Sequence, residues 1–319
     1  MASFPTTVLI TGGNGNLGRL LAKQLLARGQ TVIKFDIPGS EPAITEPGET
    51  IVTGDIRDTD TLRELIETHQ PGVIYHLASL LSGSSEADLE ASWEINASAS
   101  FRLLKLAVDC GVPRVFFAST AATYSSVDAN PMPNDYPQWP RSFYGATKVA
   151  VERAGVYFKL KHGLDFRCLR FPLVLSPFAP KTAVSAFPSH AFRAAKNDEP
   201  FVFPITPDTG ISTLFLDDVI TSIVDYVDAE PSRLSEHAYN VHSFYLDAQM
   251  VADAVTRRFP NFQYRTEIDT NTQQLISDWP DVIDDSAARA DWGWSPVYDF
   301  DQSCEGLLAM LEGEETVPG

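Results

Sequence analysis

The stretch Thr11-Gly12-Gly13-Asn14-Gly15-Asn16-Leu17-Gly18 decides the fold, because it joins an apolar strand at 7–11 to an amphipathic helix at 17–28. Gly12 permits a tight turn, Gly15 lets the backbone approach a pyrophosphate, and Gly18 lets the helix pack closely on the strand. The N-terminus of the helix adds amide donors and a partial positive charge. The sequence therefore predicts a dinucleotide site that includes Gly12, Gly15, Asn16, Leu17 and Gly18. A structural turn that merely holds glycines is the alternative.

A single carboxylate indicates which dinucleotide is bound. Asp36 ends the second expected strand, at 31–36. A carboxylate at this position accepts hydrogen bonds from the adenosine ribose hydroxyls and repels a 2′-phosphate. The sequence therefore predicts NAD, rather than NADP, as the cofactor.

Two further segments are expected to contact the same cofactor. Asp55 and Ile56 follow a third strand at 50–53, where the carboxylate would accept from the adenine amino group. The turn Leu77-Ala78-Ser79 follows a fourth strand, at 73–76, and lies at the edge where open parallel sheets bind ligands. His76, the last residue of that strand, is interpreted as a packed histidine with no catalytic role.

Apolar strands alternate with amphipathic helices through the first half of the chain. Helices are expected at 59–69, 87–110 and 144–162, and strands at 114–119 and 166–171. Parallel strands divided by helical crossovers form a sheet that is covered on both faces. The predicted fold class is therefore α/β, a doubly wound parallel sheet of the Rossmann kind.

The rhythm of strands and helices breaks after Phe171, because prolines punctuate the next segment. A strand, a helix and another strand return within 213–243. The sequence predicts a dinucleotide-binding domain of 1–172, to which 213–243 returns. The segments 173–212 and 244–319 would form a smaller, discontinuous substrate domain.

The overall charge argues against several classes of function. The chain has 42 acidic and 24 basic residues, a formal net charge of −18, which repels phosphate backbones and anionic membrane surfaces. No apolar run is long enough for a membrane helix, and the N-terminus lacks a positively charged secretory signal. The three cysteines and six histidines show no ligand spacing, so no metal is expected. We therefore expect a cytoplasmic protein that binds neither nucleic acid nor membrane.

A tyrosine and a lysine lie four residues apart in Tyr144-Gly145-Ala146-Thr147-Lys148, on one face of an expected helix. A free phenol has a pKa near ~10 and is a poor base at neutral pH, but a neighbouring cation lowers that pKa. Tyr144 could then exchange a proton with an alcohol while hydride moves to or from a nicotinamide. The turn Ala118-Ser119-Thr120 supplies a hydroxyl that can share the substrate oxygen. The alternative is a chance pairing of tyrosine and lysine on an amphipathic helix.

With these motifs the chain resembles an extended short-chain dehydrogenase/reductase, the superfamily of sugar-nucleotide epimerases and dehydratases, over nearly its whole length. The resemblance implies that Thr120 is the catalytic hydroxyl, Tyr144 the acid/base and Lys148 the residue that binds the nicotinamide ribose. It adds Asn96 to the cofactor-binding candidates, which also include Pro172; an ordinary helix-kinking amide is the alternative for Asn96. It also implies a homodimer that forms through the helices at 87–110 and 144–162.

Two segments are similar to the short-chain L-threonine 3-dehydrogenases, namely 76–83 and 278–294. In the second segment three tryptophans occur in order with an acidic pair and Arg289, although the tryptophans could merely pack the small domain. The resemblance implies that NAD oxidises the 3-hydroxyl of L-threonine or of a similar small 2-amino-3-hydroxy acid. Ser82 and Ser185 would help to hold this substrate, together with Thr120 and Tyr144.

Other branches stay open because the substrate loop is altered. The threonine enzymes carry a Thr-Thr-Asp-Tyr segment where this chain has 181–187, and only Ser185 can replace one threonine. A similar serine-containing stretch occurs in related sugar-acid dehydrogenases, such as D-erythronate dehydrogenase. Nucleotide-sugar epimerases usually place an Asn and an Arg where this chain has Leu173 and Ile211, and a diphosphate would lose charge-assisted bonds there. The alternatives are a hydroxy-acid or sugar-derivative dehydrogenase, an NDP-sugar epimerase, or a non-catalytic NAD-sensing protein. The intact tyrosine–lysine pair argues against the sensor.

Overall fold

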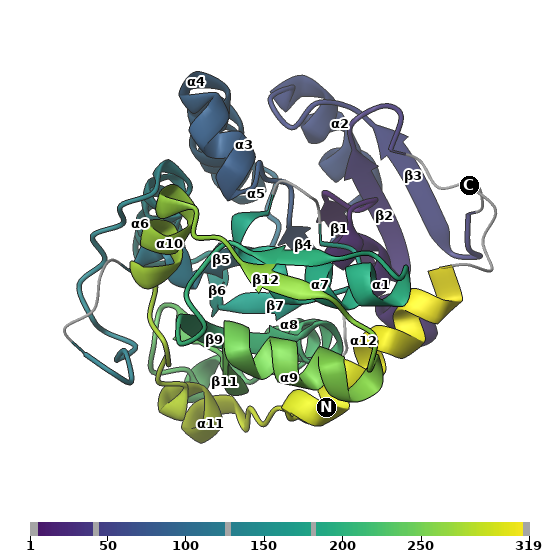
Figure 1. Cartoon of the computed structure of the whole chain (residues 1–319). Coiled ribbons are helices and arrows are strands. Elements are labelled where there is room, and N and C mark those ends of the chain that lie inside the picture. The colour runs from purple at the N-terminus through teal and green to yellow at the C-terminus, as the bar shows by residue number, and fades with distance from the viewer. Residues whose placement is uncertain (1–5, 41–44, 125–128, 180–182, 315–319) are drawn as a thin grey trace. The chain divides into compact units, whose positions relative to one another are not determined.

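The structure is a computed structural model that describes residues 6–40, 45–124, 129–179 and 183–314, and its largest sheet is parallel. In this part of the chain the sheet has seven strands in the order β10-β6-β5-β4-β1-β2-β3 (Figure 1). The strands are β1 (Thr7–Thr11), β2 (Thr31–Asp36), β3 (Glu49–Thr53), β4 (Val73–His76), β5 (Arg114–Thr120), β6 (Asp165–Phe171) and β10 (Tyr239–Asn240). The strand order runs outward in opposite directions from β1 and β4, so the predicted doubly wound α/β fold is confirmed.

Apolar residues on alternate positions of the strands hold helices against both faces of the sheet. Leu9, Ile33 and Ile74 belong to one core cluster with residues of α2, α5 and α6. Their neighbours Val8 and Ile10 are also fully buried, and successive side chains of a strand point to opposite faces. The second face is therefore covered too. The helices between or beside these strands are α1 (Asn16–Ala27), α2 (Thr59–His69), α3 (Ser82–Ala87), α4 (Leu89–Ser92), α5 (Ser100–Asp109), α6 (Phe143–His162) and α8 (Leu216–Asp228), with the short turns η2 (Ala121–Thr123) and η4 (Pro231–Arg233).

The helix expected at 87–110 is present from Leu89 to Asp109, but its middle is π-helical. Asp88 has extended backbone angles and caps α4, whose Ala91 N–H donates to its carboxylate at 2.9 Å. A π-helical segment, η1 (Trp93–Ala99), joins α4 to α5. The hydrophobic pattern did not reveal this segment, because the residues on both sides of it still read as helical. Such turns are frequent at functional sites.

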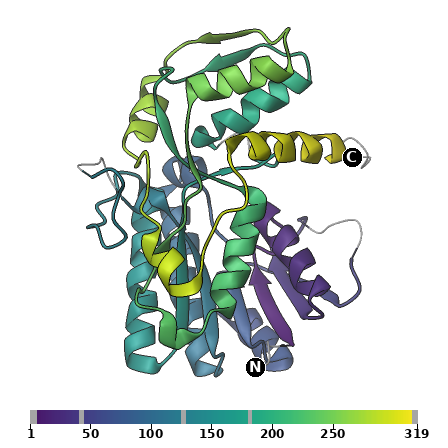
Figure 2. The same cartoon turned by 90° about the horizontal axis from the view of Figure 1, so that it is seen from below.

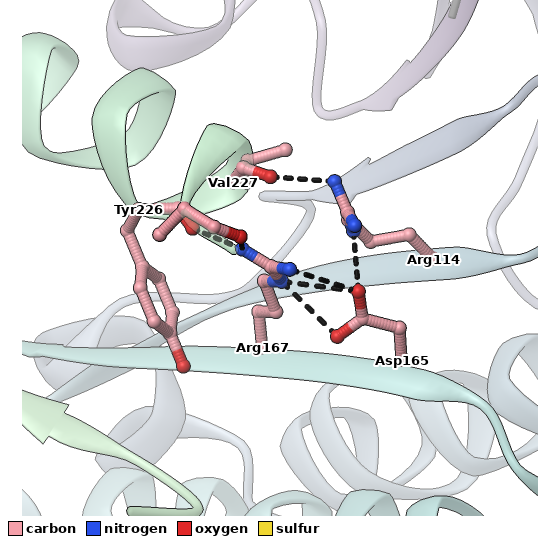
Figure 3. Close-up of polar contacts among 6 residues, drawn as sticks. Arg114, Asp165, Arg167, Tyr226 and Val227 are labelled. Carbon is pink, nitrogen blue, oxygen red and sulfur yellow. Dashed lines mark hydrogen bonds and ion pairs between the residues drawn. The ribbon is translucent and has the colours of Figure 1, made fainter. Parts of the chain in front are cut away.

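Three charged residues fasten the end of α8 to the sheet (Figure 3). Arg167 on β6 is fully buried, and its guanidinium donates to the carbonyl oxygens of Tyr226 and Ala229. Arg114 on β5 donates to the carbonyl oxygen of Val227 at 2.6 Å. The carboxylate of Asp165 accepts from both guanidinium groups, from Arg114 at 2.6 Å and from Arg167 at 3.0 Å. Carbonyl groups at a helix end that lack helical partners are thus satisfied by charged donors.

The contacts divide the chain into two compact units. Unit 1 comprises Met1–Thr120, Phe143–Arg170 and Ile220–Tyr239; unit 2 comprises Ala121–Ser142, Phe171–Val219 and Asn240–Gly319. The segment 121–142 groups with unit 2 because Met132 exchanges backbone hydrogen bonds with Val282 and Asp284, each at 2.8 Å. The proline-rich stretch after Phe171 starts the main part of unit 2.

Unit 2 has its own apolar core, built around Phe192, Phe215 and Leu246. One small sheet has the order β11-β9-β7, and β12 pairs in parallel with β8. Helices α7 and α9 pack against each other, and α12 lies against α7 (Figure 2). The elements are β7 (Leu173–Leu175), η3 (Val184–Ala186), α7 (Phe187–Lys196), β8 (Phe201–Phe203), β9 (Gly210–Phe215), β11 (Phe244–Asp247), α9 (Ala248–Arg258), β12 (Tyr264–Thr266), α10 (Thr270–Ser277), α11 (Ser286–Trp292) and α12 (Phe300–Glu314).

The tryptophan-rich segment 278–294 is a hydrogen-bonded corner of unit 2. Asp285 accepts from Nε1 of Trp294 at 2.9 Å and from Nε of Arg289 at 2.8 Å. Asp278 pairs with Arg141 at 2.8 Å. Asp285, Arg289 and Trp294 therefore have a structural reason to occur together, since the carboxylate accepts from both of the others.

Candidate active site

The glycine-rich turn between β1 and α1 is packed so tightly that side chains are excluded from it. Gly12 has φ +71°, and a Cβ there would lie 2.7 Å from the backbone nitrogen of Ala78. A Cβ on Gly18 would lie 2.3 Å from the carbonyl oxygen of Gly12. Gly13, which the sequence analysis left out, is equally constrained, because its Cβ would lie 2.6 Å from Cβ of Lys34. Gly15 caps α1 without a side-chain hydrogen bond, so this helix N-terminus suits an anion.

Asp36 lies against the glycine-rich turn, where the sequence analysis expected it. Its carboxylate accepts from the backbone N–H of Asn14 and from that of Ile37, both at 2.8 Å. The amide group of Asn14 donates to Ser40 Oγ at 3.2 Å, and Ser40 itself donates to the carbonyl oxygen of Ile37 at 2.6 Å. The buried Oδ1 of Asn14 has no hydrogen-bond partner among the described residues. Carboxylate and amide acceptors at one turn fit the hydroxyl groups of an adenosine ribose.

Asp55 lies after β3 and is held by a partner that the sequence analysis missed. Arg57 donates Nε and Nη2 to the two carboxylate oxygens, at 2.9 and 2.6 Å. The hydrogen bonds from Arg57 lower the pKa of Asp55. The next residue, Ile56, is buried in the sheet core. The side chain of Asp55 is thus fixed as an ionised acceptor.

Asn96 lies in the π turn η1 and fixes the segment that follows β4. Its Oδ1 accepts from the backbone N–H of Leu80 at 2.7 Å and from the hydroxyl of Ser79 at 3.2 Å. Its Nδ2 donates to the carbonyl oxygen of Leu80 at 3.0 Å. The side chain therefore holds the loop at Ser79 and Leu80 through hydrogen bonds.

His76 forms a buried link between the glycine-rich turn and η1. Ser100 Oγ donates to the carbonyl oxygen of Asn96 at 2.6 Å, so it accepts from Nε2 of His76 at 2.7 Å. Nδ1 of His76 then accepts from the hydroxyl of Thr11, also at 2.7 Å. Burial lowers the pKa of His76 to about 3, so the ring stays neutral. Its role is structural, in line with the sequence analysis.

Tyr144 and Lys148 lie on α6, which packs against β5, the strand that ends at Thr120. Nζ of Lys148 donates to the carbonyl oxygen of Ala118 at 2.9 Å and lies 5.4 Å from the centre of the Tyr144 ring. Burial lowers the pKa of Lys148 to about 8, although its interactions with Cys168 and Glu152 act to raise it. Burial raises the pKa of Tyr144, so the lowering expected from Lys148 is absent here.

A buried ion pair beneath Lys148 was not predicted from the sequence. Glu152 accepts from Nη2 of Arg170 at 2.9 Å and also from the hydroxyl of Ser119. The only signal for it is spacing, since Glu152 follows Lys148 by one helical turn. Arg170 comes from β6, and nothing in its local sequence points to Glu152.

The remaining candidates are divided between the two units. Ser82 begins α3 in unit 1 and is half-buried, like Thr120. Pro172 and the half-buried Ser185, in η3, belong to unit 2. Part of the substrate loop, residues 180–182, lies outside the described residues. The roles of these residues stay predictions.

The described residues present no other chemistry of this kind. No group of three His, Cys, Asp or Glu side chains within them could hold a metal ion. No helix in the same ranges is long and apolar enough to cross a bilayer. A glycine-rich turn at a helix N-terminus, a carboxylate beside it and a tyrosine–lysine pair in one doubly wound sheet are the features of a nucleotide-dependent oxidoreductase.

The chain belongs to the NAD dependent epimerase/dehydratase family, whose profile matches residues 8–242. It is 33% identical to the mitochondrial L-threonine 3-dehydrogenase of Sus scrofa over 305 residues, which cover 94% of this chain and 81% of that protein. The holo form of a GalE-like L-threonine dehydrogenase from Cupriavidus necator superposes with a TM-score of 0.88 at 30% identity, covering 96% of this chain and 99% of the other. A monomeric L-threonine 3-dehydrogenase from a metagenome database gives 0.89 at 25% identity, covering 96% and 99%. The protein is thus an NAD-dependent dehydrogenase that acts on a CH–OH group.

Proposed function

We propose that the protein oxidises the 3-hydroxyl of L-threonine, or of a similar small 2-amino-3-hydroxy acid, with NAD. The observation that carries this proposal is the similarity to L-threonine 3-dehydrogenases along 94% of the chain. The placement of Tyr144 and Lys148 at the end of β5 supports it, because an alcohol oxidation needs an acid/base there.

Each of the following candidate site residues, all of them in unit 1, then has a defined task. The glycine-rich turn and Asp36 hold the pyrophosphate and the adenosine ribose. Thr120 positions the substrate hydroxyl, and Tyr144 takes its proton. Lys148 keeps a positive charge beside the phenol and binds the nicotinamide ribose. NAD supplies the acceptor for the hydride, and its oxidised ring adds a positive charge that favours the phenolate.

Two buried apolar residues support a small substrate over a nucleotide sugar. Leu173 is 8% exposed and Ile211 is 2% exposed, and both belong to the core of unit 2. They offer a diphosphate no charge-assisted hydrogen bond. Ser82, Thr120 and Ser185 are the polar side chains that we assign to a small zwitterion.

A homodimer is part of the same proposal. Leu89, Trp93 and Phe101 are exposed on α4, η1 and α5, and Tyr157 and Leu160 are exposed on α6. Large apolar side chains gathered on adjoining helices favour association. We propose that a second copy of the chain covers these side chains, whereas one similar enzyme is monomeric. We also propose that the enzyme works in the cytosol.

Isothermal titration in the presence of NAD tests the substrate class. We expect L-threonine or another small hydroxy acid to bind, and Ser185→Ala to weaken that binding. Leu173→Asn is the matched control, since it restores only one diphosphate contact and should not create binding of UDP-glucose. Micromolar binding of UDP-glucose, with none for any small acid, would favour the epimerase branch instead. Binding of sugar acids alone would favour the alternative function, that of a sugar-acid dehydrogenase.

A further inference from the structure

The polar cluster beneath Tyr144 is buried and holds three charged groups. Glu152 is 1% exposed, Lys148 is 3% exposed and Arg170 is 6% exposed. Tyr144, Lys148 and Glu152 follow one another on one face of α6, at intervals of four residues. A reaction that uses only Tyr144 and Lys148 leaves Glu152 without a task, although burying a carboxylate is costly.

Contacts from two strands fix the carboxylate of Glu152. Its Oε2 accepts from Nη2 and Nε of Arg170, at 2.9 and 3.1 Å, and its Oε1 accepts from the hydroxyl of Ser119. Ser119 lies next to Ala118 on β5. The carbonyl oxygen of Ala118 accepts from Nζ of Lys148 at 2.9 Å. Glu152 and Lys148 therefore hold the same short segment at the end of β5.

The charge balance around Lys148 depends on Glu152. The ionisable groups around the ammonium are Tyr144 and Glu152 on α6, Cys168 and Arg170 on β6, and His76 on β4. Burial raises the pKa of the Cys168 thiol and of Tyr144, and lowers that of His76, so these three are uncharged at neutral pH. Among these groups, Glu152 carries the negative charge that offsets the positive charges of Lys148 and Arg170.

We propose that Glu152 is a positioning residue of the reacting centre, which keeps the buried Lys148 in its ammonium form and holds the end of β5 through Ser119. Without this carboxylate, Lys148 and Arg170 would be two cations in one buried cluster. An arginine keeps its proton in proteins, so Lys148 would lose its own. The inference rests on the proposed function, because the charge of Lys148 matters only if Tyr144 is the acid/base.

An NMR titration of lysine Cε signals in the folded, cofactor-free protein measures the pKa of Lys148 directly. The chain has eight lysines, so the Lys148 signal can be assigned by its loss in Lys148→Met. We expect Glu152→Gln to lower the pKa of Lys148 by about one unit or more. Glu152→Asp retains the charge and should restore most of the wild-type value. Glu64→Gln removes an exposed carboxylate from α2 and is the control for net charge.

The alkaline limb of the pH profile of kcat/KM gives the second readout. Because the ammonium of Lys148 is the active form, the alkaline limb should move to lower pH in Glu152→Gln. In Glu152→Asp it should lie near its wild-type pH. If Glu152→Gln fails to fold, Glu152→Gln/Arg170→Met removes both charges and should still lower the pKa of Lys148, though by less. An unchanged pKa in either folded variant contradicts the inference. Full turnover by Tyr144→Phe would instead contradict the proposed function, whatever the pKa of Lys148.

Discussion

At the scale of single residues, Tyr144 carries the chemical claim. Tyr144→Phe removes the hydroxyl and leaves the ring, so it should lower kcat by about 100-fold to 10,000-fold, as the loss of a general acid/base does. The affinity for NAD should change little, because the phenol acts on the substrate. Steady-state rates and cofactor titration on the same preparation separate these effects. A variant that keeps most of its kcat would show that another group moves the proton.

Asp36 decides the choice of cofactor at the same scale. Its carboxylate is anchored by two backbone N–H groups at 2.8 Å, so it is oriented before NAD arrives. Asp36→Ala should reduce the preference for NAD over NADP at least about tenfold, since hydrogen bonds to a charged group contribute about 1.5–3 kcal/mol. The ratio of kcat/KM for the two cofactors measures this. A wild-type enzyme that prefers NADP would contradict the assignment.

Residue patterns predicted some of these positions and not others. The glycine turn and Asp36 could be located from the sequence, because they stand at fixed positions between strand and helix. Arg57 and Arg170 were not, since the partner of a side chain depends on tertiary packing. The pKa of Tyr144 was predicted in the wrong direction, because a sequence shows the neighbouring lysine but not the depth of burial.

At the scale of elements, the anchor of α8 is a matter of stability rather than catalysis. Arg167→Met should lower the free energy of unfolding by about 3–5 kcal/mol, as breaking a buried charged pair does. Arg167 lies near the start of β6. Thr120 ends the neighbouring strand β5, and Lys148 on α6 contacts that same end of β5. The kcat well below the melting temperature should therefore stay at the wild-type value. Urea unfolding and kinetics on the same variant check both halves of this expectation.

The elements also show where periodicity succeeds and fails. The bounds of β1, β2, α2 and β4 were predicted to the residue, because each is a clear apolar pattern with a turn or cap at its end. The π-helical segment η1 was missed, since it sits inside a continuous helical pattern. The strands β7, β8 and β12 were missed as well, because three residues give no detectable alternation.

At the scale of the whole molecule, the exposed apolar residues of α5 and α6 predict a dimer in solution. Light scattering at micromolar concentration should give twice the chain mass, and Leu160→Glu should give a monomer. Ile268→Glu is the matched control, because Ile268 is 53% exposed in unit 2 and Leu160 is 66% exposed in unit 1. A wild-type monomer would contradict the proposed dimer.

The formation of NADH from L-threonine tests the central claim most directly. We expect the wild-type protein to reduce NAD with L-threonine, or with one close 2-amino-3-hydroxy acid, at the highest kcat/KM in a panel of threonine, serine, sugar acids and UDP-sugars. Tyr144→Phe, run in parallel, should abolish that signal. No NADH from any small hydroxy acid, together with turnover of a UDP-sugar, would contradict the account.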